Sequence, residues 1–513
     1  MSRTRRFLSG LVLSYVNVVM VTLVGLWLTR FLLHRLGESD YGLWLIVAQV
    51  LAYLLLMDIG VVALLPREIA YATGRAGSGT ESHAQLRAIG TRTMAIVMWQ
   101  VPVVAVVSVV VLLLFPAAWA PLRLPFSAVL AGFVFFFPLR VYHALLRGLQ
   151  DLAFLSITNT VSWAAGTIVI VTLVLAGAGL YALATGWVVT QAVSGLAWWG
   201  RLRRRYPQVL PAGLARVRWT EAKRHLASGG WISTAQIAEV FVAGTDLLIL
   251  GRVIGPAAVV LYFCTGKVIS VLRHQPQMLM EAAQPGLSEM KTGTSRDRLQ
   301  AVCTALAQAM LLLSGAVACV VVGVNDGFVR WWVGGEFYGG AGLTAALLGA
   351  MLLRHWNVTT VYALFAFGKE RRIAITTLAD GIVTIASQLV LALLMGPLGV
   401  ALGAMVGVVF VSLPANLIGL GRETGNTVAL AMAPLPWAWR FGLALALAVA
   451  FAARWTPSSF VSLAAATLVL TLVYVIVVAP LALRGELGSY TRQYLFPLWH
   501  RVTRALGFGA SHA

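Results

Sequence analysis

The sequence predicts an all-α polytopic membrane protein of about 14 transmembrane helices: two parallel six-helix lobes around a central cavity, plus two C-terminal helices. Three observations support this prediction. The chain is 59% hydrophobic and only 11% charged, whereas soluble domains have about 25% charged residues. Its apolar runs are long enough to cross a bilayer as helices. A set of sequence landmarks also recurs about 220 residues further along the chain.

Each predicted span is an apolar run near the length of about 20 residues that a helix needs to cross the hydrocarbon core. The runs are Phe7–Thr29, Leu43–Leu65, Ile89–Leu114, Phe126–Leu146, Ala153–Leu175, Leu180–Trp199, Leu226–Leu250, Ala258–Met280, Ala301–Val324, Gly342–Phe367, Ile373–Met395, Leu398–Leu420, Phe441–Ala453 and Phe460–Leu483. The thirteenth run is short, and its assignment as a span is the weakest of the set.

Three landmarks define the internal repeat, at offsets of 218, 220 and 220 residues. They are Leu36-Gly37 with Trp44 against Ile254-Gly255 with Tyr262, Tyr142 with Gly148 against Tyr362 with Gly368, and Gly179 against Gly399. A repeat of six helices crosses the membrane an even number of times, so the two copies are predicted to be parallel. Such repeats are typical of transporters in which two lobes rock around a central site.

The repeat also predicts the domain boundaries. We expect an N-terminal lobe over residues 1–205, a cytoplasmic linker over 206–225 and a C-terminal lobe over 226–421. Residues 422–513 then hold the thirteenth and fourteenth spans and a cytoplasmic tail.

The distribution of Lys and Arg predicts the orientation. With the N-terminus in the cytoplasm, 28 cations fall in inside segments and only six in outside connections. Both termini are therefore expected to be cytoplasmic. The same cations account for the net charge of +20, because they border spans and can attract anionic lipids. No nucleic-acid-binding module is apparent, and we expect no nucleic-acid partner.

Several kinds of chemistry have no counterpart in the sequence. It contains no Gly-rich phosphate loop followed by Lys and Ser or Thr, and no long loop that would hold a catalytic domain. The cysteines Cys264, Cys303 and Cys319 lack metal-ligand spacing. The sequence therefore predicts a protein that moves a substrate rather than an enzyme, with no cofactor and no metal.

Four short motifs resemble one family of transporters. They are R-L-G-E-S-D-Y-G-L-W from Arg35 to Trp44, M-D-I-G-V from Met57 to Val61, R-E-I-A from Arg67 to Ala70, and R-G-L-Q-D from Arg147 to Asp151. These motifs resemble the Wzx-type polysaccharide flippases of the multidrug/oligosaccharidyl-lipid/polysaccharide exporter superfamily, over the chain up to about Gly421.

The resemblance implies a bacterial inner-membrane protein that turns over a polyprenyl-pyrophosphate-linked oligosaccharide for polymerisation outside the cell. Membrane lipids and a polysaccharide polymerase are the candidate partners besides this glycan. A drug or cation antiporter of the same superfamily is the alternative, and a scaffold for a glycan-assembly complex is a third hypothesis.

A pyrophosphate substrate requires cations that face a water-filled cavity, because an unpaired charge at the bilayer centre is costly. Four cations lie inside predicted spans: Arg140, Lys267, Arg273 and Arg354. Lys267 and Arg354 lie about 15 Å from the outer ends of their helices, near the midplane. We therefore expect Arg354 to bind the headgroup, or to be paired with an acid from another helix such as Asp380.

Four acidic residues within spans support the alternative. Glu239 and Asp246 lie seven residues apart on one helix face, and Asp58 and Asp380 lie in the second and eleventh spans. Intramembrane acids often mark proton or sodium relays, but they can equally neutralise embedded cations. Glu239 and Lys267 are predicted at similar depth on adjacent helices, where they could form an ion pair. At Asp58 a hydrogen-bonded kink near Gly60 is an alternative to ion coupling.

Overall fold

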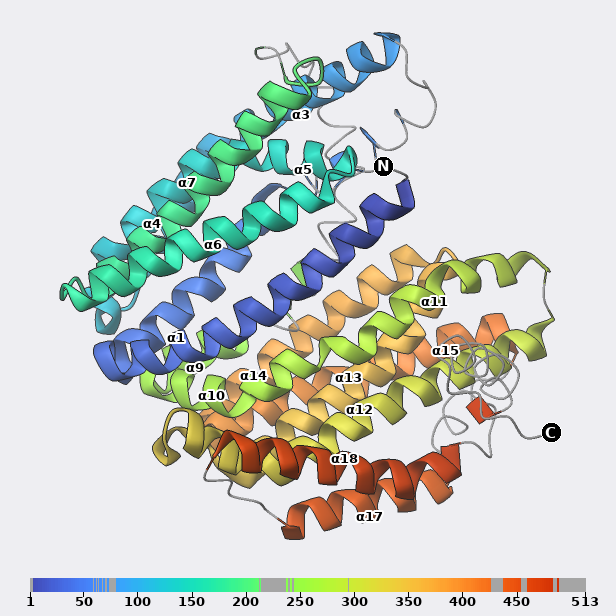
Figure 1. Ribbon diagram of the computed structural model, residues 1–513. Coiled ribbons are helices and arrows are strands. Elements are labelled where there is room, and N and C mark those ends of the chain that lie inside the picture. Colours follow the sequence, from blue (N-terminus) through green and yellow to red (C-terminus); the bar gives the residue numbers. More distant parts are fainter. Residues whose placement is uncertain are drawn as a thin grey trace, which may run out of the picture. The chain divides into compact units, whose positions relative to one another are not determined.

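The structure is a computed structural model. It describes residues 3–58, 60, 62, 64–66, 68–69, 72, 80–211, 213, 237–238, 240–241, 244–293, 295–425, 437–453, 459–482 and 487–488. All regular elements in these ranges are helices (Figure 1). Nine helical segments among them are long and apolar enough to cross a membrane. The predicted fold class, an all-α polytopic membrane protein, is confirmed, while the number of fourteen spans stays a prediction.

The described elements fall into two groups along the chain. Before residue 206 the elements are α1 (Arg3–Leu54), η1 (Leu55–Asp58), α3 (Thr80–Leu113), η2 (Ala117–Leu122), α4 (Arg123–Phe136), η3 (Phe137–Leu139), α5 (Arg140–Gly148), α6 (Leu152–Leu175) and α7 (Leu180–Arg205). After residue 245 they are α9 (Asp246–Val253), α10 (Pro256–Leu272), α11 (His274–Gly293), α12 (Arg296–Trp332), η4 (Gly335–Phe337), α13 (Gly340–Ala366), α14 (Glu370–Gly407), η5 (Val408–Ser412), α15 (Leu413–Thr424), α17 (Trp437–Ala453) and α18 (Phe460–Ala482).

Two glycines divide long helices at the places where the sequence predicts connections between spans. Gly37 interrupts α1 with φ 81°, and Gly396 interrupts α14 with φ 61° just before Pro397. Glycine adopts positive φ without a steric penalty, and proline cannot donate a backbone hydrogen bond to the preceding turn. The predicted eighth span is also divided, because α10 ends at Leu272 and α11 begins at His274.

The backbone supports the internal repeat but changes its register. Gln150 follows α5 with φ 58°, and Gly368 follows α13 with φ 72°, at an offset of 218 residues. Gly179 and Gly396 likewise share nearly the same backbone angles, at an offset of 217. The offset of 220 expected from Gly148 and Gly399 was therefore wrong by two or three residues. Aromatic and glycine identities are frequent in spans, and the turns that they mark are better located by backbone conformation.

The chain divides into two compact units. Unit 1 comprises Met1–Val240 with Gly255–Val260, and unit 2 comprises Phe241–Ile254 with Leu261–Ala513. The predicted boundaries of the lobes, the linker and the last two helices stay predictions. Many large apolar side chains on both units are exposed, for example Leu113 and Phe135 in unit 1 and Leu393 in unit 2. Such a surface suits a lipid solvent rather than water.

Small residues allow the helices of each unit to pack closely. In unit 1, a Cβ added to Gly166 would lie 2.7 Å from the carbonyl oxygen of Gly186 on the neighbouring helix. In unit 2, Gly315 and Gly323 on α12 leave room for Tyr474 and Leu470 of α18. Tyr474 also donates a hydrogen bond of 2.8 Å to the carbonyl of Leu312. Small residues at helix contacts are typical of membrane proteins, since the backbones can then approach each other.

Candidate functional site

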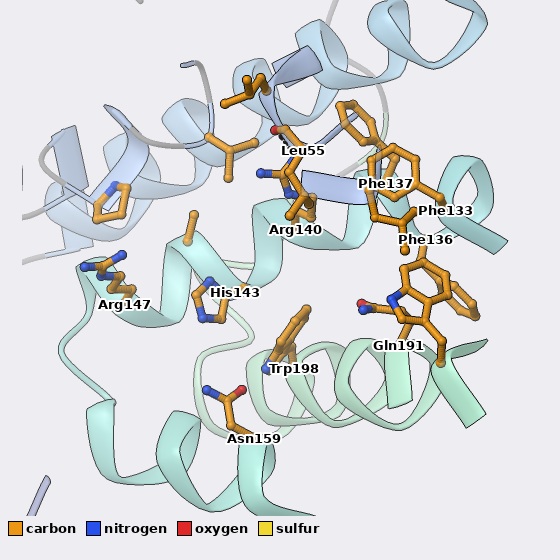
Figure 2. A pocket seen from close by; sticks show the side chains of 16 residues that line it. Leu55, Phe133, Phe136, Phe137, Arg140, His143, Arg147, Asn159, Gln191 and Trp198 are labelled. Carbon is orange, nitrogen blue, oxygen red and sulfur yellow. Dashed lines mark hydrogen bonds between the residues drawn. The ribbon is translucent and has the colours of Figure 1, made fainter. Parts of the chain in front are cut away.

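Unit 1 contains a cavity of about 540 Å³ between its helices. Residues from α1, η1, α4, η3, α5, α6 and α7 line it (Figure 2). Among the described residues that line the cavity, none is acidic and two are arginines. The side chain of Asp58, at the end of η1, lies outside the part of the chain that the structure describes.

One face of a nearly continuous helix supplies the cations. Phe133, Phe137, Arg140, His143 and Arg147 follow one another along α4, η3 and α5 at spacings of three or four residues, and Phe136 lies beside Phe137. Residues at these spacings lie on the same side of a helix. Figure 2 shows Arg140, His143 and Arg147 side by side along α5, which carries the whole basic face of the cavity.

Arg140 links α5 to η1, the short helix that follows the end of α1. Its Nη1 donates a hydrogen bond of 3.1 Å to the carbonyl oxygen of Leu55 in η1. Its guanidinium carbon also lies 5.4 Å from the centre of the Phe137 ring. The last carbonyls of a helix lack partners within the helix, so a cation at this position satisfies one of them. The side chain is held in a fixed place on the cavity wall.

His143 lies between the two arginines. Its ring centre is 4.9 Å from that of Trp198 on α7, with the rings inclined at 56°. The charges of Arg140 and Arg147 both act on this imidazole. Arg147, at the end of α5, is the more exposed of the two arginines. The basic face therefore runs from the interior of the unit to its edge.

The opposite wall of the cavity is uncharged and polar. Asn159 of α6 and Trp187, Gln191 and Trp198 of α7 form it. The indole nitrogen of Trp198 is buried and has no hydrogen-bond partner among the described residues. The close contact of Gly166 with Gly186 holds α6 and α7 together and so fixes the position of this wall.

Only one of the four predicted cations, Arg140, lies in this cavity. The others belong to unit 2. Lys267 is half-buried on α10, and its Nζ lies 4.9 Å from the centre of the Phe263 ring. Its predicted partner Glu239 lies outside the described residues, so that ion pair stays a prediction. Arg273 lies at the break between α10 and α11, within electrostatic reach of Asp246.

Arg354 is paired with Asp380, the partner that the sequence analysis gave as the alternative to a headgroup. The Nη1 atom of Arg354 lies 2.5 Å from Oδ2 of Asp380, and its Nη2 lies 3.1 Å from Oδ1. Thr384 and Ser412 also donate hydrogen bonds to this carboxylate, of 2.9 and 2.6 Å. The carboxylate is almost completely buried, with 1% exposure, while the arginine is 20% exposed.

The remaining predicted acids are only partly described. Asp246, at the start of α9, accepts a hydrogen bond of 3.1 Å from the hydroxyl of Tyr262 on α10. Asp58 lies in η1, but its side chain is outside the description, as is the whole of Glu239. Whether any of these acids couples ion movement to transport stays a prediction. Within the described residues, no three His, Cys, Asp or Glu side chains gather in a way that could hold a metal ion.

Most of the cavity was not predicted from the sequence. Arg147 was predicted only as a motif residue and as one of the cations that indicate the orientation, and His143, Asn159, Gln191 and Trp198 were not predicted as site residues. The spacing of Arg140, His143 and Arg147 was a usable signal, because it places three basic side chains on one helix face. The polar residues of α6 and α7 offered no comparable signal, since single amides and indoles are common in membrane helices.

Comparisons with known proteins show the fold and match part of the chain to a family model. Residues 121–337 match the family described as "Polysaccharide biosynthesis protein". Among solved structures, the lipid II flippase MurJ in an inward closed conformation has a TM-score of 0.62 at 10% identity, covering 90% of this chain and 98% of that one. An inward-facing multidrug resistance MATE family transporter of the MOP superfamily has a TM-score of 0.58 at 13% identity, covering 82% and 95%. No curated protein matches the sequence.

These findings confirm the resemblance predicted from the four motifs. The chain has the fold of MurJ and of MATE transporters of the MOP superfamily, and its central part matches a polysaccharide biosynthesis family. The matched segment includes every residue of α4, α5, α6 and α7 that lines the cavity of unit 1. The family match and the cavity therefore lie on the same part of the sequence.

Proposed function

We propose that this protein, a polytopic membrane protein with the fold of MOP superfamily transporters, flips a polyprenyl-pyrophosphate-linked oligosaccharide across the bacterial inner membrane. The flipped glycan would serve cell-surface polysaccharide biosynthesis. The observation that carries the proposal is the basic cavity of unit 1, with Arg140 and Arg147 on one wall and no acidic residue among the described residues that line it.

The cavity fits the charge of the substrate. A pyrophosphate cannot cross hydrocarbon without compensation, because a charge at the bilayer centre costs several kcal/mol or more. Guanidinium groups suit phosphate oxygens, since they offer several donors in a planar fork. Two arginines seven residues apart on α5 lie about 10 Å apart along the helix axis. They would let the headgroup pass from one cation to the next.

The fold supports a mechanism by alternating access. The headgroup would move through polar space inside the protein while the polyprenyl tail stays in the surrounding lipid. This mechanism needs no chemical step, so the protein would act as a transporter and not as an enzyme. Both termini would face the cytoplasm, and a polysaccharide polymerase would receive the flipped glycan at the outer surface.

The test uses cells in which a variant replaces the wild-type gene, and it measures which lipid-linked intermediate accumulates. With Arg140→Ala or Arg147→Ala, we expect a polyprenyl-linked glycan to accumulate on the cytoplasmic side, with export at least tenfold below that of the wild type. A lost charged hydrogen bond of about 1.5–3 kcal/mol gives an effect of this size or larger. Protein levels in the membrane should be unchanged.

The matched control is Arg203→Ala. Arg203 lies at the end of α7 over the ring of Trp199 and does not line the cavity, so glycan export should be normal. Normal export in both cavity variants would refute the headgroup role of α5. A gene deletion without an accumulated polyprenyl glycan, but with new drug sensitivity, would instead support the alternative of a drug or cation antiporter. In that case Asp58→Asn should abolish transport.

A further inference from the structure

We infer that the α6–α7 wall of the cavity, made of Asn159, Gln191 and Trp198, is a subsite for a sugar ring of the transported molecule. The inference rests on the proposed function and divides its binding site into two chemically different parts. The basic face of α5 would hold the pyrophosphate. The uncharged wall would hold the sugar that is attached directly to it.

Unpartnered polar groups are the first support for this subsite. The indole N–H of Trp198 is buried without a hydrogen-bond partner among the described residues. The side-chain amides of Asn159 and Gln191 also line the cavity, and within the described residues neither makes a hydrogen bond. Asn159 is exposed and Gln191 is half-buried, so the indole N–H is the one buried group of the three without a partner. A buried donor without a partner is unfavourable, which indicates that a ligand completes its hydrogen bonding, and the two amides on the same wall can bond to that ligand as well.

The chemistry of these groups indicates which ligand. An amide both donates and accepts hydrogen bonds, and an indole N–H donates. Together they match the hydroxyl and acetamido groups of a sugar, which also donate and accept. None of the three carries a charge that would favour phosphate. The two arginines come from a different helix, so the two kinds of group are separated across the cavity (Figure 2).

An aromatic surface is the second support. The ring of Trp198 is held in place by the imidazole of His143, 4.9 Å away on the basic face. The flat apolar side of a sugar ring packs well on an aromatic ring, whose N–H can meanwhile bond to a hydroxyl. Because His143 lies between Arg140 and Arg147, Trp198 is adjacent to the phosphate-binding face. This is the arrangement that a sugar linked directly to a pyrophosphate requires.

The size of the cavity limits how much of the glycan is recognised. Its volume of about 540 Å³ lies within the range of about 300–1,000 Å³ that is usual for small-molecule sites. A diphosphate and one sugar ring would occupy such a space, whereas a complete oligosaccharide would not. Unit 1 would therefore select the first sugar and be indifferent to the sugars beyond it.

The experiment measures binding of two separate probes to the purified full-length protein in lipid nanodiscs. Geranyl pyrophosphate is the sugar-free probe, and a panel of methyl glycosides of common hexoses and N-acetylhexosamines forms the second set. We expect at least one methyl glycoside to bind the wild type, and Trp198→Phe and Gln191→Leu each to weaken that binding at least tenfold. Both variants should bind geranyl pyrophosphate within twofold of the wild type.

Trp199→Phe is the matched control, because Trp199 is adjacent on α7, does not line the cavity and carries Arg203 over its ring. This control should bind both probes normally. The subsite is refuted if no methyl glycoside binds the wild type, if the control loses as much affinity as the wall variants, or if the wall variants lose affinity for both probes alike. Should Trp198→Phe fail to fold, Gln191→Leu alone decides the question.

The experiment also separates this inference from the proposed function. If geranyl pyrophosphate does not bind the wild type while a methyl glycoside does and the wall variants weaken it, the sugar subsite stands and the pyrophosphate part of the proposed function fails. Arg147→Ala provides the reciprocal measurement, because it should weaken geranyl pyrophosphate binding and leave the methyl glycoside unaffected.

Discussion

In unit 1 the arginines of α5 line a cavity, whereas in unit 2 the arginine in the middle of α13 is held by a buried carboxylate. Near the C-terminal ends of α5 and α13, corresponding residues lie 218 positions apart in the sequence. By this register Arg140, His143 and Arg147 correspond to Val358, Val361 and Phe365. Val358 and Val361 pack against the apolar core of unit 2. The same stretch of helix is thus a polar wall in one unit and part of the core in the other.

The acids show the same contrast. Asp380 of unit 2 corresponds to Ser162 of unit 1, and both side chains are buried. Ser162 donates a hydrogen bond to the backbone of its own helix, while Asp380 holds the guanidinium of Arg354. In unit 2 the buried carboxylate of Asp380 compensates the charge of Arg354, whereas no acidic side chain is found among the described residues that line the cavity of unit 1. The difference separates a candidate binding unit from a unit whose midplane arginine is held by an acid.

The largest expected effect is an all-or-none difference in cysteine labelling, which tests whether the two units are parallel copies. Single cysteines replace Gln150, in the turn after α5, and Glu370, two residues beyond Gly368 in the corresponding turn after α13, and both positions are exposed. A membrane-impermeant thiol reagent should label both only after lysis. Gly342→Cys, at the opposite end of α13, should be labelled in intact cells, and a Cβ there meets no other atom within 4 Å.

The native cysteines give a low background in this test, because all three are buried. Labelling of positions 150 and 370 from opposite sides would mean that the units are inverted copies. The correspondence between α5 and α13 would then be lost, and with it the comparison.

The next largest effect concerns the ion pair of unit 2. Arg354→Leu or Asp380→Leu alone leaves an uncompensated buried charge, which typically costs about 3–5 kcal/mol, whereas the double variant should regain much of that loss. Thermal unfolding of the purified protein in detergent, followed by size-exclusion chromatography, measures the difference. Strictly additive losses would show that the two side chains do not stabilise each other.

A reciprocal variant in unit 1 sharpens this test. Ser162→Asp introduces the acid of unit 2 at the corresponding buried position of unit 1, where the serine hydroxyl bonds to the backbone carbonyl of Asn159 on its own helix. We expect a loss comparable to that of Arg354→Leu. A fully stable Ser162→Asp protein would show that a cavity cation or water can reach this position, and the two units would then differ less than their structures indicate.

The smallest effects concern two ion pairs, one in each unit. Their members at the corresponding turns, Asp151 and Lys369, have opposite charges. In unit 1 Asp151 binds Arg201 at 2.8 Å, and in unit 2 Lys369 binds Glu423 at 2.8 Å. Asp151→Asn should cost about 1 kcal/mol, because that carboxylate is only 12% exposed and also accepts a hydrogen bond from Tyr206. Lys369→Gln should cost less than about 0.5 kcal/mol, since the lysine is 42% exposed.

Salt provides the check on these two pairs. Raising the ionic strength should reduce the effect of Lys369→Gln more than that of Asp151→Asn, because exposed charges are screened more strongly. Reversing both charges of the unit 1 pair, with Asp151→Lys and Arg201→Glu together, should restore most of the stability that either change alone removes. Equal salt sensitivity in both units would contradict the difference in burial.

The sequence was sufficient to predict the fold class, because composition and the length of apolar runs determine which solvent the chain can occupy. It was also sufficient to find Arg354 and Asp380 as intramembrane charges and to name each as a partner of the other. It was not sufficient to find the polar wall of Asn159, Gln191 and Trp198. These residues come together only because α6 and α7 pack against each other at Gly166 and Gly186, and that contact depends on tertiary structure.

The two landmarks of the repeat at an offset of 220 were wrong for a similar reason, whereas Gly37 and Gly255, at an offset of 218, both have positive φ. Gly399 was chosen because it is a glycine ahead of a span, yet Gly396 is the residue with positive φ. Gly399 and Gly403 serve a different purpose, since a Cβ on either would collide with the preceding part of the same helix pair, at Leu391 and Gln388. A glycine that permits a turn and a glycine that permits close packing look alike in a sequence, and only the backbone angles distinguish them.

The π turn η5 determines where unit 2 can lose a residue. A π turn holds one residue more than the α-helical turn that it replaces. Loss of one residue between Val408 and Val411 would therefore convert η5 into an α-helical turn and leave the following helix close to its present orientation. Loss of one residue within α15, for example Ala415, would instead turn the rest of that helix by about 100°. Side chains of α15 that now face the core, such as Leu417 and Leu420, would then face outward. A gene for this protein should therefore tolerate the deletion of one codon in η5 far better than the deletion of one codon at the start of α15.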